Sequence, residues 1–199
     1  MSTDSHGLIH NKRRVLVFGI TGFLAGAIKA QLEAQGTEVV GVTRGEPEGN
    51  AVSMRDSSWL AQLSKGGPFS GVVWAQGENS SGGVMEENSE SIHRVFDANV
   101  VFITDTMRSL VDHELIQSPA RVVILSSVWQ LAARSKKLGY LLAKSAISGL
   151  VPSLAIDLAD RHIAVNAVLP GVIESPMARV NLSDQIGRAS CRERVSSPV

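Results

Sequence analysis

The chain has only one cysteine, Cys191, so no disulfide can form within a single molecule, which is typical of a reducing compartment. Its 199 residues carry no formal net charge, so no general attraction to nucleic acid or to an anionic membrane is expected. No apolar run approaches the roughly 20 residues of a membrane span. The opening MSTDSHGLIHNKRR lacks an apolar signal core. These absences predict a cytoplasmic protein without nucleic-acid or membrane partners.

Short apolar runs rich in β-branched residues alternate with longer amphipathic segments. We expect strands at 15–19, 38–44, 71–77, 121–127 and 162–170. We expect helices at 24–35, 56–63, 87–115 and 140–160, with Gly36 ending the first of them. The strands are apolar throughout, as in a sheet that is covered on both faces. This alternation predicts an α/β fold, a Rossmann-type doubly wound parallel sheet with helices on both faces.

A glycine turn follows the first expected strand in GITGFLAGAI, where Gly19, Gly22 and Ala25 give the spacing G-x-x-G-x-x-A. Small residues there allow a tight turn, close approach of the backbone to a pyrophosphate, and contact between helix and strand. The N–H groups at the start of the next helix can bind phosphate. Such a turn can also merely connect two elements, but its position favours a nucleotide site.

The end of the second expected strand bears on the choice of nucleotide. NAD-binding folds often place an acidic residue there, against the ribose 2′-hydroxyl. This chain has Thr43 and Arg44 instead. An arginine can bind a 2′-phosphate through several donors, although it could also be a solvated loop residue. We therefore expect NADP(H) rather than NAD(H).

Tyr140, the only tyrosine, precedes Lys144 by four positions, so one face of a helix carries both side chains. A free phenol has a pKa of about 10 and is a poor base at neutral pH. A nearby ammonium favours the phenolate and should lower that pKa. Tyr140 could then give a proton to a carbonyl or take one from an alcohol. The pattern Y-x-x-x-K is common on its own, so its context decides.

Three further features are expected at the same edge of the sheet. Ser127 ends an apolar strand where open α/β sheets bind ligands, although its hydroxyl could simply cap local backbone. Asn99 lies inside an expected helix, where asparagine is unfavourable unless its side chain has a role or lies on the surface. Pro170 and Gly171 follow the last expected strand.

Taken together, these pieces resemble the short-chain dehydrogenase/reductase family, in its branch of simple single-domain carbonyl reductases. The resemblance extends from about Arg14 to Met177 and rests on GITGFLA, DANVV, LSSV, GYLLAK and VNAVLPGVIESPM. Two pieces depart from that branch. The glycine spacing is closer to the extended branch, which modifies sugar nucleotides. The stretch Trp74-Ala75-Gln76-Gly77 stands where Asn-Asn-Ala-Gly is usual, so only Gly77 matches, and Trp74 is expected to be a packing residue.

The resemblance implies roles for the matching residues. Tyr140 would be the general acid/base, and Lys144 would lower its pKa and hold the nicotinamide ribose. Ser127 would orient the substrate carbonyl, and Asn99 would kink its helix and hold a relay water. Asp56 would lie near the adenine, although a helix N-cap explains it equally well. The implied cofactor-binding residues are Gly19, Thr21, Gly22, Phe23, Leu24, Arg44, Asp56, Gly77, Tyr140, Lys144, Pro170, Gly171 and Ser175. No metal is implied.

The prediction is therefore an NADP(H)-dependent oxidoreductase that interconverts a carbonyl and an alcohol by hydride transfer. Two alternatives stay open, a sugar-nucleotide epimerase or dehydratase and a non-catalytic nucleotide-binding regulator. Apolar residues on the two long helices exceed what one sheet face needs, for example Val100, Phe102, Ile147 and Leu154. In the family the matching helices form a subunit interface, so a homo-oligomer through 87–115 and 140–160 is expected.

The composition changes after Gln185. The stretch IGRASCRERV, residues 186–195, has no apolar period and matches the translation of a common sequencing-library adapter. We expect a tail at 1–13, one NAD(P)-binding domain at 14–185 and a non-native read-through segment at 186–199. The family continues with a substrate-covering segment and a seventh strand, so the final strand and the substrate lid are expected to be missing.

Overall fold

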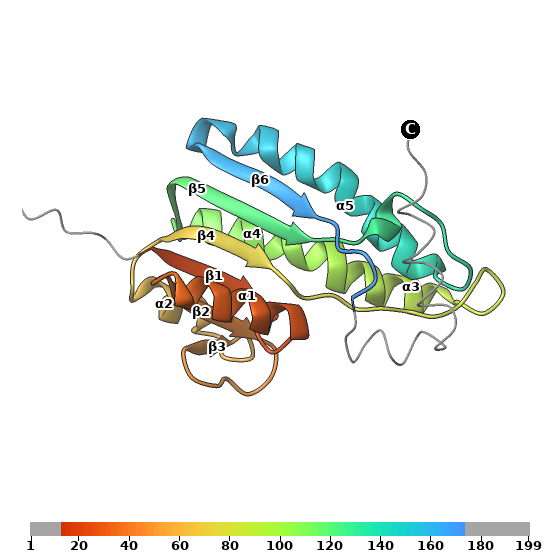
Figure 1. Cartoon of the computed structure of the whole chain (residues 1–199), viewed down its shortest axis with the longest axis horizontal. Helices are drawn as coiled ribbons and strands as arrows, with labels where there is room; N and C mark the ends of the chain where they lie inside the picture. Colours follow the sequence, from red (N-terminus) through yellow and green to blue (C-terminus); the bar gives the residue numbers. More distant parts are fainter. Residues whose placement is uncertain (1–12, 174–199) are drawn as a thin grey trace, which may run out of the picture.

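A computed structural model describes residues 13–173 (Figure 1). Ser175, the expected boundary at Gln185 and the segment 186–199 lie outside these residues, as do residues 1–12. Six parallel strands pair in the order β3-β2-β1-β4-β5-β6. They are β1 (Arg14–Phe18), β2 (Glu38–Thr43), β3 (Ala51–Ser53), β4 (Phe69–Trp74), β5 (Ile116–Leu125) and β6 (Ile163–Val168). This is a doubly wound order that reverses between β1 and β4, as predicted, and ligands bind at such a reversal.

Helices pack on both faces of the sheet. They are α1 (Phe23–Ala34), α2 (Trp59–Ser64), α3 (Ser89–Phe96), α4 (Phe102–Asp112) and α5 (Leu138–Asp157). Because side chains alternate along a strand, Leu16 and Phe18 face the cluster that holds α2 to α5, whereas Val17 faces α1. The cluster around Val17 on this second face contains α1 as its only helix among residues 13–173.

From the sequence we expected every strand to be buried on both faces, but the structure shows that this is not so. Along β5 and β6 burial alternates, and Arg121, Ala164 and Asn166 are exposed. The expectation was wrong here because these strands are not apolar throughout: Arg121 and Asn166 place polar side chains on the exposed face. Among residues 13–173, nothing packs over this part of the second face as α1 packs over β1, β2 and β4.

The centre of the larger cluster is aromatic. Trp74 is fully buried, stacks on Phe18 with ring centroids 5.1 Å apart, and donates from Nε1 to Thr106 Oγ1 at 2.9 Å. Phe102 meets Phe18 edge to face. The indole therefore has both apolar contacts and a partner for its one donor, which confirms the expected packing role of Trp74.

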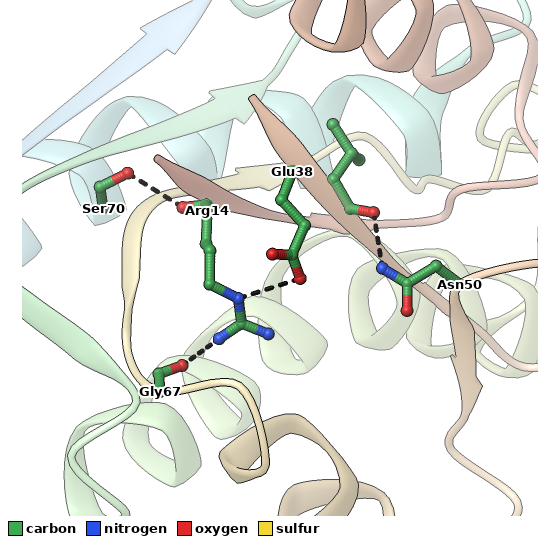
Figure 2. Close-up of polar contacts among 6 residues, drawn as sticks. Arg14, Glu38, Asn50, Gly67 and Ser70 are labelled. Carbon is green, nitrogen blue, oxygen red and sulfur yellow. Dashed lines mark hydrogen bonds and ion pairs between the residues drawn. The ribbon is translucent and has the colours of Figure 1, made fainter. Parts of the chain in front are cut away.

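A polar cluster ties the strands together at the end away from their carboxyl termini (Figure 2). Arg14 Nε donates to Glu38 Oε1 at 3.1 Å, and Arg14 also donates to the carbonyl of Gly67. Ser70 Oγ donates to the carbonyl of Arg14 at 3.0 Å. The starts of β1, β2 and β4 are thus fixed relative to one another, which sets where their carboxyl ends meet.

Several element boundaries differ from the expected ones. The expected helix 87–115 is interrupted by a π-helical stretch, Asp97–Val101, between α3 and α4. The expected helix 56–63 begins later, because Asp56 accepts from Ser58 N at 2.8 Å and forms a turn before α2 rather than an N-cap. The three-residue strand β3 was not expected. The glycine end of α1 is confirmed, since Gly36 has a φ of +74°.

Helix α5 differs from the expectation that no segment is long and apolar enough to span a membrane. It has 20 residues with a mean hydropathy of 1.3, so by length and composition it could span a membrane. Lysine and serine residues interrupt this helix, so it contains no long uninterrupted apolar run. The same composition is found in core helices of soluble proteins, and here Ala143 and Ile147 are fully buried against the sheet.

Candidate active site

A cleft of about 820 Å³ opens where the carboxyl ends of the central strands meet. The loops after β1, β2, β4 and β5 and the first turns of α5 border it. The arrowheads in Figure 1 mark the carboxyl ends of these strands. Ten of the residues predicted from the sequence line this cleft: Gly19, Thr21, Gly22, Phe23, Leu24, Arg44, Gly77, Asn99, Tyr140 and Lys144. The fold therefore brings the predicted nucleotide turn and the predicted proton donor to one site.

The glycine turn after β1 is built for close approach. Gly19 has a φ of +75°, and a Cβ there would lie 2.8 Å from the backbone of Gln76. Gly19 N donates to the carbonyl of Val42 at 2.9 Å, which holds the turn over the end of β2. Ala25 is fully buried against Val17. These positions confirm two of the expected reasons for small residues, the tight turn and the contact between helix and strand.

The loop after β2 brings opposite charges to the cleft. Arg44 and Glu46 both line it, and both are exposed. Thr43 Oγ1 accepts from Gly45 N at 3.0 Å and shapes the loop between them. Sequence reasoning singled out Arg44 and overlooked Glu46, although the carboxylate is only two residues further on.

Asn99 is held firmly in the cleft wall. It is 1% exposed, and its Nδ2 donates to the carbonyls of Val95 and Glu78, both at 2.8 Å. The first of these bonds reaches back within the helix, at the place where the helix becomes π-helical. A Cβ on Gly77 would lie 2.8 Å from Asn99 Oδ1, so the Asn99 side chain can lie this close to residue 77 only because that residue is glycine. The expected interruption of the helix at Asn99 is confirmed.

Tyr140 lies on the first turn of α5, between Ser127 and Lys144. Lys144 Nζ lies 5.7 Å from the centroid of the phenol ring and donates to the carbonyl of Leu125 at 3.2 Å. Ser127 is buried, and a hydrogen bond joins its side chain to Tyr140. The hydroxyl of Ser127 also accepts from Trp129 N at 3.3 Å, so it caps local backbone as well.

The electrostatics of this pair differ from the expectation. Burial raises the pKa of Tyr140 above its usual value, and the hydrogen bond from Ser127 only partly opposes this. The predicted lowering of the Tyr140 pKa was wrong for this structure, because desolvation is the largest effect on the phenol. Burial also lowers the pKa of Lys144 to about 8.

Some predicted residues do not line the cleft. Asp56 is exposed and bonds to Ser58 and Gln62, which lowers the pKa of its carboxyl. Pro170 accepts from Val128 N at 3.1 Å and so supports the loop that carries Ser127. Ser127 contacts Tyr140 but does not line the cleft itself. Gly171 is exposed and does not line the cleft either. Met54 lines the cleft without having been predicted.

The cleft suits a dinucleotide by its own features. It combines a turn that excludes a Cβ at Gly19 with the start of α1, where Gly22 leaves backbone donors without a side-chain cap. Buried polar atoms without a hydrogen-bond partner in the described structure also occur in its wall, namely both amide atoms of Gln76 and Oδ1 of Asn99. Such atoms are expected where a polar ligand supplies the partner.

Comparisons with known proteins agree with this geometry. Residues 60–195 match the family model described as enoyl-(acyl carrier protein) reductase. The chain is 35% identical over 105 residues to 2-(R)-hydroxypropyl-CoM dehydrogenase of Xanthobacter autotrophicus, covering 52% of this chain and 42% of that protein. It is 26% identical to 3beta-hydroxysteroid dehydrogenase 1 of Eggerthella lenta, covering 89% and 77%. It thus spans less than half of the first relative.

Solved structures give the same fold. A short chain dehydrogenase family protein from Francisella tularensis superposes with a TM-score of 0.73 at 23% identity, over 90% of this chain and 77% of that one. The aldohexose dehydrogenase of Thermoplasma acidophilum gives 0.73 at 22% identity, over 94% and 74%. At these identities the likeness concerns the fold alone.

Proposed function

The chain belongs to the short-chain dehydrogenase/reductase family, and on that premise we propose that it is a cytoplasmic, NADP(H)-dependent oxidoreductase that interconverts a carbonyl and an alcohol. The observation that carries the proposal is the placement of Tyr140. Its side chain lines the same cleft as the glycine turn and Lys144, and Ser127 lies next to it.

The residues of this chain supply the proton and the orientation. When bound, the nicotinamide cofactor supplies or accepts the hydride. In reduction, Tyr140 gives its hydroxyl proton to the substrate oxygen as that oxygen becomes an alcohol, and in oxidation it takes the proton back. The raised pKa of Tyr140 keeps the phenol protonated at neutral pH, which favours the role of acid. Ser127 does not line the cleft itself, so its hydroxyl would act through the phenol of Tyr140.

Lys144 and Asn99 would organise this reaction. Lys144, with a pKa of about 8, is mostly protonated at neutral pH and stabilises negative charge that forms on the phenol. Asn99 holds the carbonyl of Glu78 and presents its free Oδ1 beside Gly77, close to Lys144 Nζ. Asn99 Oδ1 and Lys144 Nζ can bind the same water molecule, as the family resemblance implies.

The substitution Tyr140→Phe tests the catalytic role. With NADPH and a set of simple aldehydes and ketones, we expect kcat to fall by ~100-fold or more, since the proton donor is gone. Binding of NADPH, followed by its fluorescence, should be retained. Unchanged turnover by the variant would contradict the proposal, and a wild-type protein that binds NADPH without any turnover would favour the regulator.

The glycine spacing favours a second candidate, a sugar-nucleotide epimerase or dehydratase. Such an enzyme returns its cofactor to the starting state, so total NADPH is unchanged after many turnovers, whereas a carbonyl reductase consumes it. Incubation with UDP-glucose and measurement of both cofactor and product separates the two.

The preference for NADP(H) rests on Arg44. We expect Arg44→Ala to weaken NADPH binding by ~10-fold or more while NADH binding changes little, because only NADPH carries the 2′-phosphate that the guanidinium would bind. The matched control is Arg55→Ala, which removes an exposed arginine that does not line the cleft. Equal losses for both cofactors would show that Arg44 does not select between them.

We also propose that the chain forms a homo-oligomer through α3–α4 and α5. The residues first considered, Val100 and Ile147, are buried in the core, and Phe102 and Leu154 pack against it, so they cannot carry this proposal. Other apolar residues of these helices are exposed, namely Val101, Leu142 and Ile156, at 37%, 47% and 76%.

A further inference from the structure

The helix that carries Tyr140 begins at a residue that cannot cap it. The first N–H groups of a helix have no acceptor within the helix, and a side-chain oxygen usually supplies one. At α5 the N-cap residue is Lys137, whose ammonium only donates, and it makes no capping bond. The acceptors for this turn must therefore come from another part of the chain.

They come from the 78–88 segment, which joins β4 to α3. Leu138 N donates to the carbonyl of Gly82 at 3.0 Å. Gly139 N donates to Oε2 of Glu87 at 2.5 Å. A carboxylate at this end of a helix is also favoured by the helix dipole. Glu87 thus caps α5 from a distance of 52 residues along the chain.

The fit around this cap leaves no spare room. Gly139 is buried, and a Cβ there would lie 2.6 Å from Oε2 of Glu87 and 3.1 Å from Oγ of Ser80. A Cβ on Gly82 would lie 2.6 Å from Cγ of Glu87. The Glu87 side chain therefore approaches two backbones at distances that only glycine permits, its carboxylate at Gly139 and its Cγ at Gly82. A change in the length of this side chain should therefore disturb the start of the helix.

The Lys137 side chain makes the reciprocal contact. It is 8% exposed, and its Nζ donates to Asn79 Oδ1, to the Ser80 carbonyl and to Ser81 Oγ, all within 3.0 Å. The start of α5 and the 78–88 segment are therefore tied in both directions. The same segment is held at its other end by Asn99, which bonds to the carbonyl of Glu78.

We propose that Glu87 is a positioning residue for Tyr140. Its carboxylate fixes Gly139 and so sets the orientation of the phenol on the next residue, against Ser127 and Lys144. The consequence for turnover rests on the proposed function, but the position of the phenol can be measured without it.

The chain itself offers the probe, because Tyr140 is its only tyrosine. Tyrosinate absorbance of the full chain therefore reports the ionisation of this one phenol. Its midpoint should lie above 10.0, because burial raises the pKa. The charged groups around this turn are Lys144 on α5, then Lys137 and Arg134 on the preceding loop, and Glu87 on the 78–88 segment.

Two variants separate reach from charge. Glu87→Asp keeps the charge and shortens the side chain, whereas Glu87→Gln keeps the length and an acceptor oxygen but removes the charge. We expect the Asp variant to loosen the first turn of α5 and to lower the Tyr140 midpoint toward 10.0, and the Gln variant to leave it near the wild-type value. Glu90→Gln, at an exposed carboxylate in the first turn of α3, is the control and should change nothing.

Turnover gives a second reading. In the Asp variant kcat should fall by ~10-fold or more with the KM for NADPH unchanged, and in the Gln variant most of kcat should remain. If the Gln variant shifts the midpoint and the Asp variant does not, charge rather than position acts, and the proposal fails. It also fails if neither variant shifts the midpoint. A wild-type protein without turnover would count against the proposed function, while the titration would still decide the role of Glu87.

Discussion

At the scale of one residue, the burial of Lys144 in its charged form costs free energy of folding. Its side chain is 4% exposed, and its ammonium donates to the carbonyl of Leu125. Burial lowers its pKa from 10.5 to about 8. That difference corresponds to about 3 kcal/mol by which folding disfavours the charged form. A cost of this size fits the proposed chemical role of the lysine better than a stabilising one.

We therefore predict that Lys144→Met raises the free energy of unfolding at pH 7 and abolishes turnover. The folded wild type loses the lysine proton at about pH 8, whereas the unfolded chain keeps it until 10.5. Between these values the unfolded state binds more protons, so the wild type gains stability as the pH rises. The advantage of the variant, about 3 kcal/mol below pH 8, should shrink toward pH 10.

Urea denaturation of both proteins over this pH range measures the difference. Tyr140 does not disturb the comparison, because its pKa is raised above 10.0. An advantage for methionine that stays constant with pH would mean that the lysine is not desolvated as described.

The proximity of Tyr140 and Lys144 could be predicted from the sequence because it depends on spacing along one helix. The direction of the phenol's pKa could not, since it depends on how deeply the first turn of α5 is buried. Gln76 illustrates the same limit. Its place in the chain was noted as a departure from the family, but the burial of its amide in the cleft wall without a partner is visible only in the folded chain.

At the scale of elements, the glycine turns join the sheet to the cleft. Gly77 follows β4 and lies against Asn99, whose side chain is fixed by two hydrogen bonds. Gly77 has no positive φ, so an alanine there would be tolerated by the backbone itself. The obstacle is the 2.8 Å contact with Asn99 Oδ1, and moving that side chain breaks bonds to both Val95 and Glu78.

We predict that Gly77→Ala lowers the free energy of unfolding by ~1–3 kcal/mol and strongly reduces turnover. Gly26→Ala is the matched control on α1, where nothing lies within 4 Å of the added methyl group. The control should instead stabilise the protein by ~0.5–1 kcal/mol, since alanine is the better helix former. Thermal melting of both variants checks the pair. Similar melting temperatures for the two would show that Asn99 yields easily.

The helices and strands that the sequence predicted were those with a clear apolar period. Strand β3 has three residues and no such signal, so it is recognised only by its pairing with β2. The break between α3 and α4 was anticipated only through the resemblance, as a kink at Asn99. Its π-helical form depends on a hydrogen bond from Asn99 to Val95 that no propensity describes.

The whole molecule could be predicted at the level of layers. Alternation of apolar strands and amphipathic helices gave a doubly wound sheet, because right-handed crossovers leave few other arrangements. The strand order and the uncovered parts of β5 and β6 depend on long-range packing. The cluster of Arg14 with Glu38 and Gly67, far from the cleft, belongs to the same class, since nothing local in the sequence pairs residues 24 and 53 positions apart.

Self-association is the property of the whole molecule that the helices of the larger cluster should control. Leu142 and Ile156 are fourteen positions apart, which is close to four helical turns, so they lie on one exposed face of α5. Burial of these two side chains against a second protomer would be favourable, because it removes apolar surface from water. Helices α3 and α5 pack side by side, so both can contribute to one interface.

We predict that light scattering of the full chain gives a multiple of the 21.2 kDa protomer. The double substitution Leu142→Glu and Ile156→Glu should give the protomer mass, because two carboxylates would have to be desolvated in the interface. Leu131→Glu is the control, since this residue is 77% exposed but lies outside these helices. A wild-type mass of one protomer at micromolar concentration would contradict the prediction. A control that dissociates as completely would move the interface from α5 to the loop before it.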